Sequence, residues 1–181
     1  MTKRIILAVS GSISAYKSAD LTSKLKKKGY DIHVIMTEAA QAFITPLTFQ
    51  VLSKNPVHSD VMEEKLAERI NHIDLAKEAD LFIVAPASAN TIAKLAHGMA
   101  DNMLTATALA LPSTTPKLIA PAMNTKMYEN PLTKKNLDTL QEVGYQEILP
   151  KSGLLACGDT GRGALADIAV IIESIDNALT R

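Results

Sequence analysis

Several residue types are scarce in this 181-residue chain, and each scarcity excludes a class of protein. The single cysteine, Cys157, permits no internal disulfide and no cysteine-rich metal site. Tryptophan is missing and aromatic residues make up only 4%, so aliphatic side chains must fill the core. The 19 basic and 19 acidic residues cancel, so the chain lacks the positive field that draws proteins onto nucleic acid or anionic membranes.

Long apolar runs are missing as well. The run at residues 5–9 follows Lys3 and Arg4 and imitates the start of a signal peptide, but it is shorter than the ~7–15 residues that such a segment needs. No window approaches the roughly 20 apolar residues of a membrane span. The four histidines are scattered without ligand spacing, so we expect no metal site. We therefore expect a soluble, cytoplasmic protein without nucleic-acid or membrane partners.

Short aliphatic runs alternate with helical patterns along the chain. The strand candidates are residues 5–9, 32–36, 81–85 and 118–120, with weaker ones at 145–149 and 56–61. Runs that are apolar on both faces are typical of central strands in a parallel sheet. The helical patterns are residues 14–28, 90–111, 133–143 and a last helix with the apolar stripe Leu165, Ile168, Ile172, Ile175 and Leu179. This alternation predicts a single α/β domain over residues 1–181, with an open, doubly wound parallel sheet.

Small and polar residues follow four of the predicted strands, where doubly wound sheets bind ligands. These segments are residues 10–14 (SGSIS), 37–40 (TEAA), 86–91 (PASANT) and 121–124 (PAMN). Backbone amides at helix starts suit a phosphate, although each hydroxyl would serve equally well as a helix cap. The dinucleotide and P-loop glycine fingerprints are absent, and no acidic pair or Ser-His-Asp set indicates hydrolysis. Together the four segments predict a phosphate-bearing cofactor.

Five motifs also recur in the order of a known family. They are residues 11–17 (GSISAYK), 72–75 (HIDL), 86–91 (PASANT), 98–102 (GMADN) and 121–127 (PAMNTKM). With these motifs the chain resembles, over essentially its whole length, the homo-oligomeric flavin-containing cysteine decarboxylases. Within that family it is most similar to the branch that makes 4′-phosphopantetheine for coenzyme A. The resemblance implies a flavodoxin-like or Rossmann-like fold, with FMN as cofactor.

The resemblance further implies which residues bind and react. FMN would be held by Gly11, Ser12, Ile13, Ser14, Thr37, Ser88, Ala89, Asn90, Thr91 and Ala122. His72 matches the family's active-site histidine, Asn124 the residue that holds the substrate carboxylate, and Cys157 the proton donor of the last step. The further substrate contacts would be Met123, Leu155 and Ala156.

The implied reaction is FMN-dependent decarboxylation of 4′-phospho-N-pantothenoylcysteine to 4′-phosphopantetheine. Direct loss of CO₂ would leave a carbanion that cannot delocalise. Oxidation by the flavin to a thioaldehyde removes this obstacle, because CO₂ then leaves an enethiol behind. The flavin returns a hydride to the enethiol, and the Cys157 thiol, protonated at neutral pH because thiols have an ordinary pKa of about 8.5, supplies the proton.

Each of these residues also has an ordinary structural explanation. A lone histidine is commonly a surface or capping residue, an asparagine such as Asn124 commonly closes a turn after a proline, and a lone cysteine usually packs as a small hydrophobe. Cys157, however, lies in a glycine-rich segment at residues 153–163 that has no helical or strand period. That composition is typical of a flap over a site.

Other functions of the same fold stay open at this point. Some relatives decarboxylate a peptide C-terminal cysteine and stop at the enethiol, which Cys157 argues against. Others are non-catalytic regulatory subunits, which the joint presence of His72, Asn124 and Cys157 argues against. Prenyl-transferring flavoproteins lack the 121–127 motif. Where the family motif usually has Trp, this chain has Tyr128, which we expect to keep an aromatic contact with a smaller ring and to change the chemistry little.

The resemblance also implies partners. Its members are trimers or assemblies of trimers, which hold flavin and substrate where subunits meet. Many relatives fuse this domain to the synthetase that makes the substrate. Because the chain ends at Arg181, we expect that a separate synthetase protein supplies the substrate.

Overall fold

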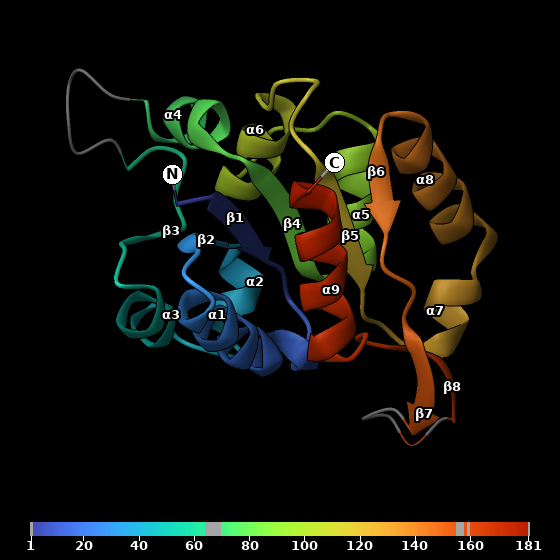
Figure 1. Cartoon of the computed structure of the whole chain (residues 1–181). Helices are drawn as coiled ribbons and strands as arrows, with labels where there is room; N and C mark the ends of the chain where they lie inside the picture. Colours follow the sequence, from blue (N-terminus) through green and yellow to red (C-terminus); the bar gives the residue numbers. More distant parts are fainter. Residues whose placement is uncertain (1, 64–69, 155–157, 159, 181) are drawn as a thin grey trace.

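The computed structural model describes residues 2–63, 70–154, 158 and 160–180. A six-stranded sheet crosses the molecule in the order β3-β2-β1-β4-β5-β6, with helices on both faces (Figure 1). Its strands are β1 Arg4–Val9, β2 Asp31–Met36, β3 Val57–His58, β4 Leu81–Ala87, β5 Lys117–Pro121 and β6 Tyr145–Glu147. Every neighbouring pair is parallel, which confirms the predicted doubly wound sheet.

The helices alternate with these strands. They are the 3₁₀ helix η1 Ile13–Tyr16 and the α-helices α1 Lys17–Lys27, α2 Glu38–Gln41, α3 Pro46–Ser53, α4 Asn71–Glu78, α5 Ala89–Ala96, α6 Met103–Leu109, α7 Thr125–Glu129, α8 Pro131–Glu142 and α9 Ile168–Leu179. In the part of the chain that the structure describes, no helix combines the length and the apolar character that crossing a membrane requires.

The single helix predicted over residues 90–111 is wrong, because the structure divides it into α5 and α6. Gly98 follows α5 with φ +65°, a left-handed conformation that suits glycine and ends a helix. Asn102 then starts α6 as its N-cap, in a reciprocal capping box with Thr105. The two end signals outweigh the continuous apolar pattern.

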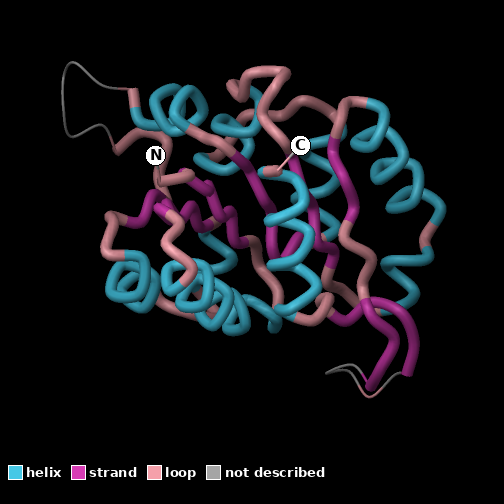
Figure 2. The backbone as a smooth tube through the Cα atoms, viewed as in Figure 1, coloured by secondary structure: helices cyan, strands magenta, loops and turns pink. Residues whose placement is uncertain are grey.

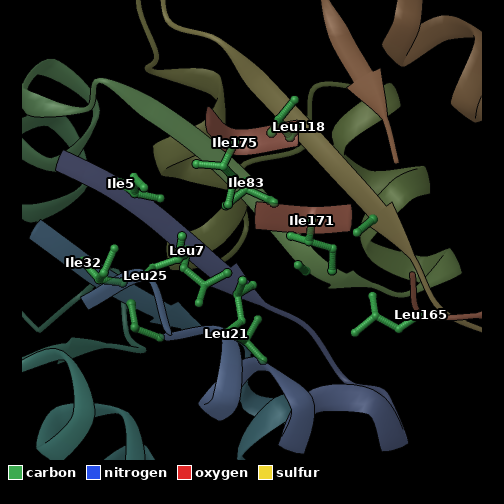
Figure 3. Close-up of a cluster of buried hydrophobic side chains, with 14 of the residues drawn as sticks. Ile5, Leu7, Leu21, Leu25, Ile32, Ile83, Leu118, Leu165, Ile171 and Ile175 are labelled. Carbon is green, nitrogen blue, oxygen red and sulfur yellow. The ribbon is translucent and has the colours of Figure 1, made fainter. Parts of the chain in front are cut away.

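Two buried clusters fill the space on either side of the sheet. Alternate residues of β1 enter opposite clusters, Ile5 and Leu7 on one face and Ile6 on the other. Helices α1, α3 and α9 cover the first face, where Ile171 and Ile175 of α9 pack onto the sheet (Figure 3). Helices α4 to α8 contribute to the second cluster. The stripe predicted for the last helix is thus largely right, but α9 begins after Leu165 and buries Ile171 more fully than Ile172.

A small antiparallel hairpin follows the main sheet, formed by β7 Lys151–Leu154 and β8 Thr160–Ala164. It projects beyond the body of the molecule next to α7 (Figures 1 and 2). The prediction that residues 153–163 have no strand structure is therefore wrong for the described part of that segment. The strands are hard to recognise in the sequence because they contain Gly153, Gly161 and Gly163, and glycine normally weakens a strand.

Strand order places the ligand-binding edge. From β1 the chain moves outward to β2 and β3, then returns to β4 on the other side of β1 and continues to β5 and β6. The sheet therefore changes winding direction between β1 and β4. In such sheets the crevice at the carboxyl ends of these two strands is the usual ligand site.

Candidate active site

A pocket of about 460 Å³ lies at the carboxyl ends of β1, β4 and β5. It is lined by Gly11, Ser12, Ile13, Ser14, Tyr16, Lys17, Ser88, Ala89, Ala122, Met123, Asn124, Met127, Gly163 and Ala164. This volume falls within the range of about 300–1,000 Å³ that is usual for small-molecule sites. The pocket thus occupies the place where the strand order changes direction.

Most of the predicted binding residues come together in this pocket. The cofactor candidates that line it are Gly11, Ser12, Ile13, Ser14, Ser88, Ala89 and Ala122. The substrate candidates Met123 and Asn124 line it as well. Thr37, Asn90 and Thr91 are not among the described residues of its lining. Leu155, Ala156 and Cys157 lie outside the described residues.

The loop after β1 approaches its neighbour closely. A Cβ atom on Gly11 would lie 2.6 Å from the Cβ of Ala39, so this close approach requires glycine. Ser12 follows as the N-cap of η1, and its side chain accepts the backbone N–H of Ser14 at 3.2 Å. The hydroxyls predicted for ligand binding therefore also organise the start of the helix.

Two hydroxyls at the other strand ends have mainly capping roles. Ser88 is the N-cap of α5 and accepts the backbone N–H of Thr91 at 3.2 Å, while its own hydroxyl donates to Thr91 Oγ1. Thr37 caps α2 by accepting the N–H of Ala40 at 3.2 Å. The capping interpretation that the sequence left open is present at both positions, and Ser88 combines it with a place in the pocket wall.

Ser10 is a residue whose contribution the sequence did not reveal. Its side chain is fully buried and donates to the carbonyl of Pro86 at 2.7 Å, while its Oγ accepts the N–H of Ser88 at 2.8 Å. The register of β4 with β5 shifts between Val84 and Ala87, so backbone groups there leave the regular ladder. Ser10 satisfies two of them and joins the ends of β1 and β4. The sequence feature that could have indicated this role is a serine directly after a buried strand.

Asn124 closes the far side of the pocket from the N-terminus of α7. Its Oδ1 accepts the backbone N–H of Lys126 at 2.9 Å, so Asn124 is the N-cap of that helix. The same side chain lines the pocket. Asn124 therefore both closes the turn and lines the pocket.

The β7–β8 hairpin is held against this segment by backbone contacts. The N–H of Met123 donates to the carbonyl of Gly163 at 2.9 Å. A Cβ on Gly163 would lie 2.3 Å from the oxygen of Met123, and one on Gly161 would lie 2.6 Å from Oγ1 of Thr125. Only glycine permits these approaches, so the glycines that obscured the strand signal are the residues that dock the hairpin.

His72 is placed apart from the pocket. It is the second residue of α4, which lies well separated from α7 and the hairpin (Figure 1). It does not belong to the described lining of the pocket, and its buried Nδ1 has no hydrogen-bond partner among the described residues. The fold of one chain thus does not unite the predicted histidine with the predicted cofactor residues.

Tyr128 lies in the core and not in the described wall of the pocket. Its side chain is only 1% exposed and belongs to the buried cluster on the second face of the sheet. The neighbouring Met127, not Tyr128, is among the described residues of the pocket wall. The aromatic ring at this position therefore packs within the core.

Charge is sparse around the pocket. Lys17 is the single charged side chain in its described lining, and its Nζ lies 6.0 Å from the ring centre of Tyr16. Just outside, the hydrogen bond from Lys151 and, more weakly, the positive charge of Lys17 lower the pKa of Asp167. Hydroxyls, backbone amides and one cation suit an anionic ligand, because no carboxylate of the described lining competes with it.

The chain is similar to known proteins over almost its whole length. The model of the Flavoprotein family matches residues 1–180. A probable phosphopantothenoylcysteine decarboxylase of Streptococcus mutans is 64% identical over 99% of this chain and 100% of its own length. The coenzyme A biosynthesis bifunctional protein CoaBC of Bacillus subtilis is 50% identical over 94% of this chain, which spans only 42% of that protein.

Solved structures agree with these relatives. A cysteine-to-serine mutant of PPC decarboxylase complexed with pantothenoylaminoethenethiol has a TM-score of 0.89 and 32% identity, and the match covers 100% of both chains. The FMN binding protein AtHal3 has a TM-score of 0.84 and 33% identity over 98% of this chain and 97% of its own. Because the family model and the relatives match almost the entire length, the chain belongs to the Flavoprotein family.

Proposed function

We infer that the chain is an FMN-dependent carboxy-lyase that converts 4′-phosphopantothenoylcysteine to 4′-phosphopantetheine in coenzyme A biosynthesis. The observation that carries this function is the pocket where the sheet changes winding direction, because it gathers the glycine, serine and Asn124 segments in one wall. The whole-length likeness to a probable phosphopantothenoylcysteine decarboxylase identifies the substrate class.

The residues of the pocket fit FMN. Gly11 lies close to Ala39 and lines the pocket, so that backbone without a side chain borders the ligand site. Ser12 and Ser88 are the N-caps of helices that begin there, and backbone amides at a helix start suit a phosphate. Ile13 and Met127 add apolar surface that suits a flat ring. When bound, FMN supplies the two-electron chemistry that side chains cannot perform.

We assign Asn124 the binding of the substrate carboxylate. Its cap bond to the N–H of Lys126 holds the carboxamide in one orientation. The amide NH₂ of an asparagine donates two hydrogen bonds, which suits a carboxylate. Fixing that carboxylate orients the bond between the α-carbon and the carboxylate, which breaks when CO₂ leaves. Correct orientation is one of the largest contributions that a protein makes to the reaction rate.

Cys157 lies outside the described residues, and its role as proton donor is a proposal from the family resemblance. A Cys157→Ser variant should still release CO₂ but accumulate the unsaturated enethiol, because a serine hydroxyl is a far weaker acid than a thiol. Mass analysis of the product reports this directly. A normal saturated product from the variant would remove Cys157 from the mechanism.

We further propose that a second copy of the chain brings His72 to the pocket, so that the active form is a homo-oligomer. Two observations support this arrangement: α4 is separated from the pocket wall, and Nδ1 of His72 has no hydrogen-bond partner in the described part of the chain. A trimer is the state that the family resemblance favours, and a cytoplasmic location with a separate synthetase as the source of substrate completes the proposal.

Mixing two inactive variants tests the shared site. His72→Asn and Asn124→Asp should each lower turnover at least about a hundredfold, because each removes a group that acts on the reacting substrate. If the pocket and the histidine come from different copies, co-expressed variants form mixed oligomers in which some sites carry both native residues. Activity then returns in the mixture. Failure of the mixture to regain activity, with oligomers confirmed by light scattering, would contradict the proposal.

The function itself is tested on the purified wild-type protein. A flavin absorbance band near ~450 nm should be present or appear after FMN is added. Anaerobic mixing with 4′-phosphopantothenoylcysteine should release CO₂ and give a saturated aminoethanethiol product. A bound flavin without turnover would overturn the substrate assignment, and turnover of a peptide C-terminal cysteine instead would favour the alternative oxidative decarboxylase.

A further inference from the structure

Helix α7 is too short to hold itself in place. It has five residues, Thr125–Glu129, yet it positions two residues of the pocket wall, its cap Asn124 and Met127. An isolated helix of this length is unstable in water, because the conformational entropy lost in forming the first turn exceeds the stabilisation from its few hydrogen bonds. Contacts with the rest of the protein must therefore set its direction.

Tyr128 makes such contacts with both neighbouring elements. Its hydroxyl donates to Oε1 of Glu147 on β6 at 2.8 Å. The Nζ of Lys134 on α8 lies 3.5 Å from the centre of its ring, within the range of a cation–π interaction. Burial, together with the hydrogen bond and charge of Glu147, raises the pKa of Tyr128 well above its usual value. The hydroxyl therefore stays protonated and remains a donor.

The backbone connects Tyr128 directly to Asn124. The N–H of Tyr128 donates to the carbonyl of Asn124 at 3.0 Å, and the N–H of Lys126 donates to its Oδ1 at 2.9 Å. Both the backbone and the side chain of Asn124 are thus bonded to α7. A rotation of α7 would therefore turn the carboxamide by a comparable amount.

We propose that Tyr128 and Glu147 form a positioning pair that fixes the direction of the Asn124 carboxamide. The pair acts through α7, because Tyr128 is not among the described residues that line the pocket. The inference rests on the proposed function, in which Asn124 binds the substrate carboxylate. It gives the departure from tryptophan at this position a physical role, since a tyrosine hydroxyl reaches the carboxylate of β6.

Kinetics of matched variants test the pair. Tyr128→Phe removes the hydroxyl and keeps the ring. It should raise KM for the substrate about tenfold, because the free energy of a hydrogen bond to a charged group corresponds to at least a tenfold change in an equilibrium constant. FMN affinity should change less than the KM for the substrate, since Met127 is the one residue proposed to contact FMN that lies on α7. Tyr145→Phe is the control, because Tyr145 is buried in the same cluster but lies on β6.

Variants of Glu147 separate positioning from simple stability. Glu147→Gln keeps an acceptor oxygen for the tyrosine and should retain KM within about threefold, whereas Glu147→Ala should match Tyr128→Phe. The double variant Tyr128→Phe/Glu147→Ala should be no worse than either single variant, because each already removes the same bond. A KM that is unchanged in Tyr128→Phe, or raised equally in Tyr145→Phe, would overturn the proposal.

Hydrogen exchange gives a readout that needs no turnover. In Tyr128→Phe the amides of residues 126–129 should exchange at least about fivefold faster, while those of α8 keep their wild-type rates, because local opening is governed by local contacts. Unchanged exchange in α7 would overturn the pair whatever the substrate. If wild-type protein shows no turnover while Tyr128→Phe still loosens α7, the proposed function fails and the structural coupling stands.

Discussion

The two edges of the parallel sheet are built from different chemistry. At the amino ends of the strands, Arg4 bonds Asp31 with an Nε–Oδ2 distance of 2.9 Å and also pairs with Glu78, while its backbone N–H donates to Asp80 at 2.7 Å. Lys3 adds a further ion pair to Asp80 at 2.9 Å. Opposite charges thus tie β1, β2 and the start of β4 together.

The carboxyl edge uses hydroxyls and glycines instead. Ser10 joins β1 to β4, Gly11 permits the close approach of Ala39, and Lys17 is the single charge of the described pocket lining. Carboxylates at this edge would repel an anionic ligand, so neutral donors satisfy the backbone there. The ionic stabilisation is thus placed at the edge of the sheet opposite the pocket of the carboxyl edge. Variants of the two edges should therefore affect different properties.

The largest effect is expected from Gly163→Ala at the carboxyl edge. The added Cβ would lie 2.3 Å from the oxygen of Met123, so the hairpin and the Asn124 segment must move apart. A displacement of that kind should lower kcat/KM by about a hundredfold. Steady-state kinetics measure it. Gly153→Ala is the matched control, because a Cβ there meets no atom of the described residues within 4 Å, and equal losses in both variants would contradict this explanation.

A smaller effect is expected from Ser10→Ala. The variant leaves the N–H of Ser88 without its buried acceptor, while the carbonyl of Pro86 keeps only the backbone N–H of Ser10 at 3.2 Å; the loss should lower the free energy of unfolding by about 2 kcal/mol. FMN should bind about tenfold more weakly, because Ser88 lies in the pocket wall and loses the hydrogen bond that holds its backbone in place. Urea unfolding and flavin fluorescence titration measure the two effects. Ser174→Ala, on the exposed face of α9, should change neither.

The smallest effect, and the one specific to the amino edge, is expected from Asp31→Asn. Burial would raise the pKa of Asp31, but hydrogen bonds from Asn55 and Arg4 and the charge of His33 outweigh it and lower that pKa to about 2. A folded-state pKa below the unfolded one stabilises the protein above the unfolded value near 3.8, and this contribution is lost as the pH falls toward 2.

Solvent screening reduces that contribution, so Asp31→Asn should cost about 1 kcal/mol at pH 7 and almost nothing near the folded-state pKa. Urea unfolding measured across the acid range tests this, and kcat/KM at neutral pH should stay at the wild-type value. Asp20→Asn, which breaks an exposed pair with Lys24, provides the comparison and should cost less than about 0.5 kcal/mol at every pH. A loss of activity in Asp31→Asn would break the distinction between the two edges.

Much of the fold follows from local sequence signals. Continuous aliphatic runs such as residues 5–9 and 81–85 indicate buried parallel strands, and the structure places them at the centre of the sheet. The strand-end rule then locates the pocket without any knowledge of side-chain positions. The carboxyl-edge residues Gly11, Ser12 and Asn124 are predictable for this reason.

The remaining features depend on contacts between distant segments. Ser10 and Pro86 are 76 positions apart, and no local pattern announces their hydrogen bond. The hairpin could not be predicted from the sequence, because the need for glycine at positions 161 and 163 comes from their close contacts with Thr125 and Met123, which lie far away in the chain. Capping roles at Thr37 and binding roles have the same local signature, so sequence alone cannot separate them.

The double use of Asn124, as helix cap and as part of the pocket wall, limits how the enzyme can be redesigned. An apolar replacement would remove a polar group from the pocket wall and the N-cap of α7 together. Aspartate and serine are caps of similar quality, so they preserve the helix while changing what the pocket accepts. Aspartate would repel a carboxylate and favour an amide or an amine in its place. Altered substrate charge is thus accessible at this position through capping residues alone.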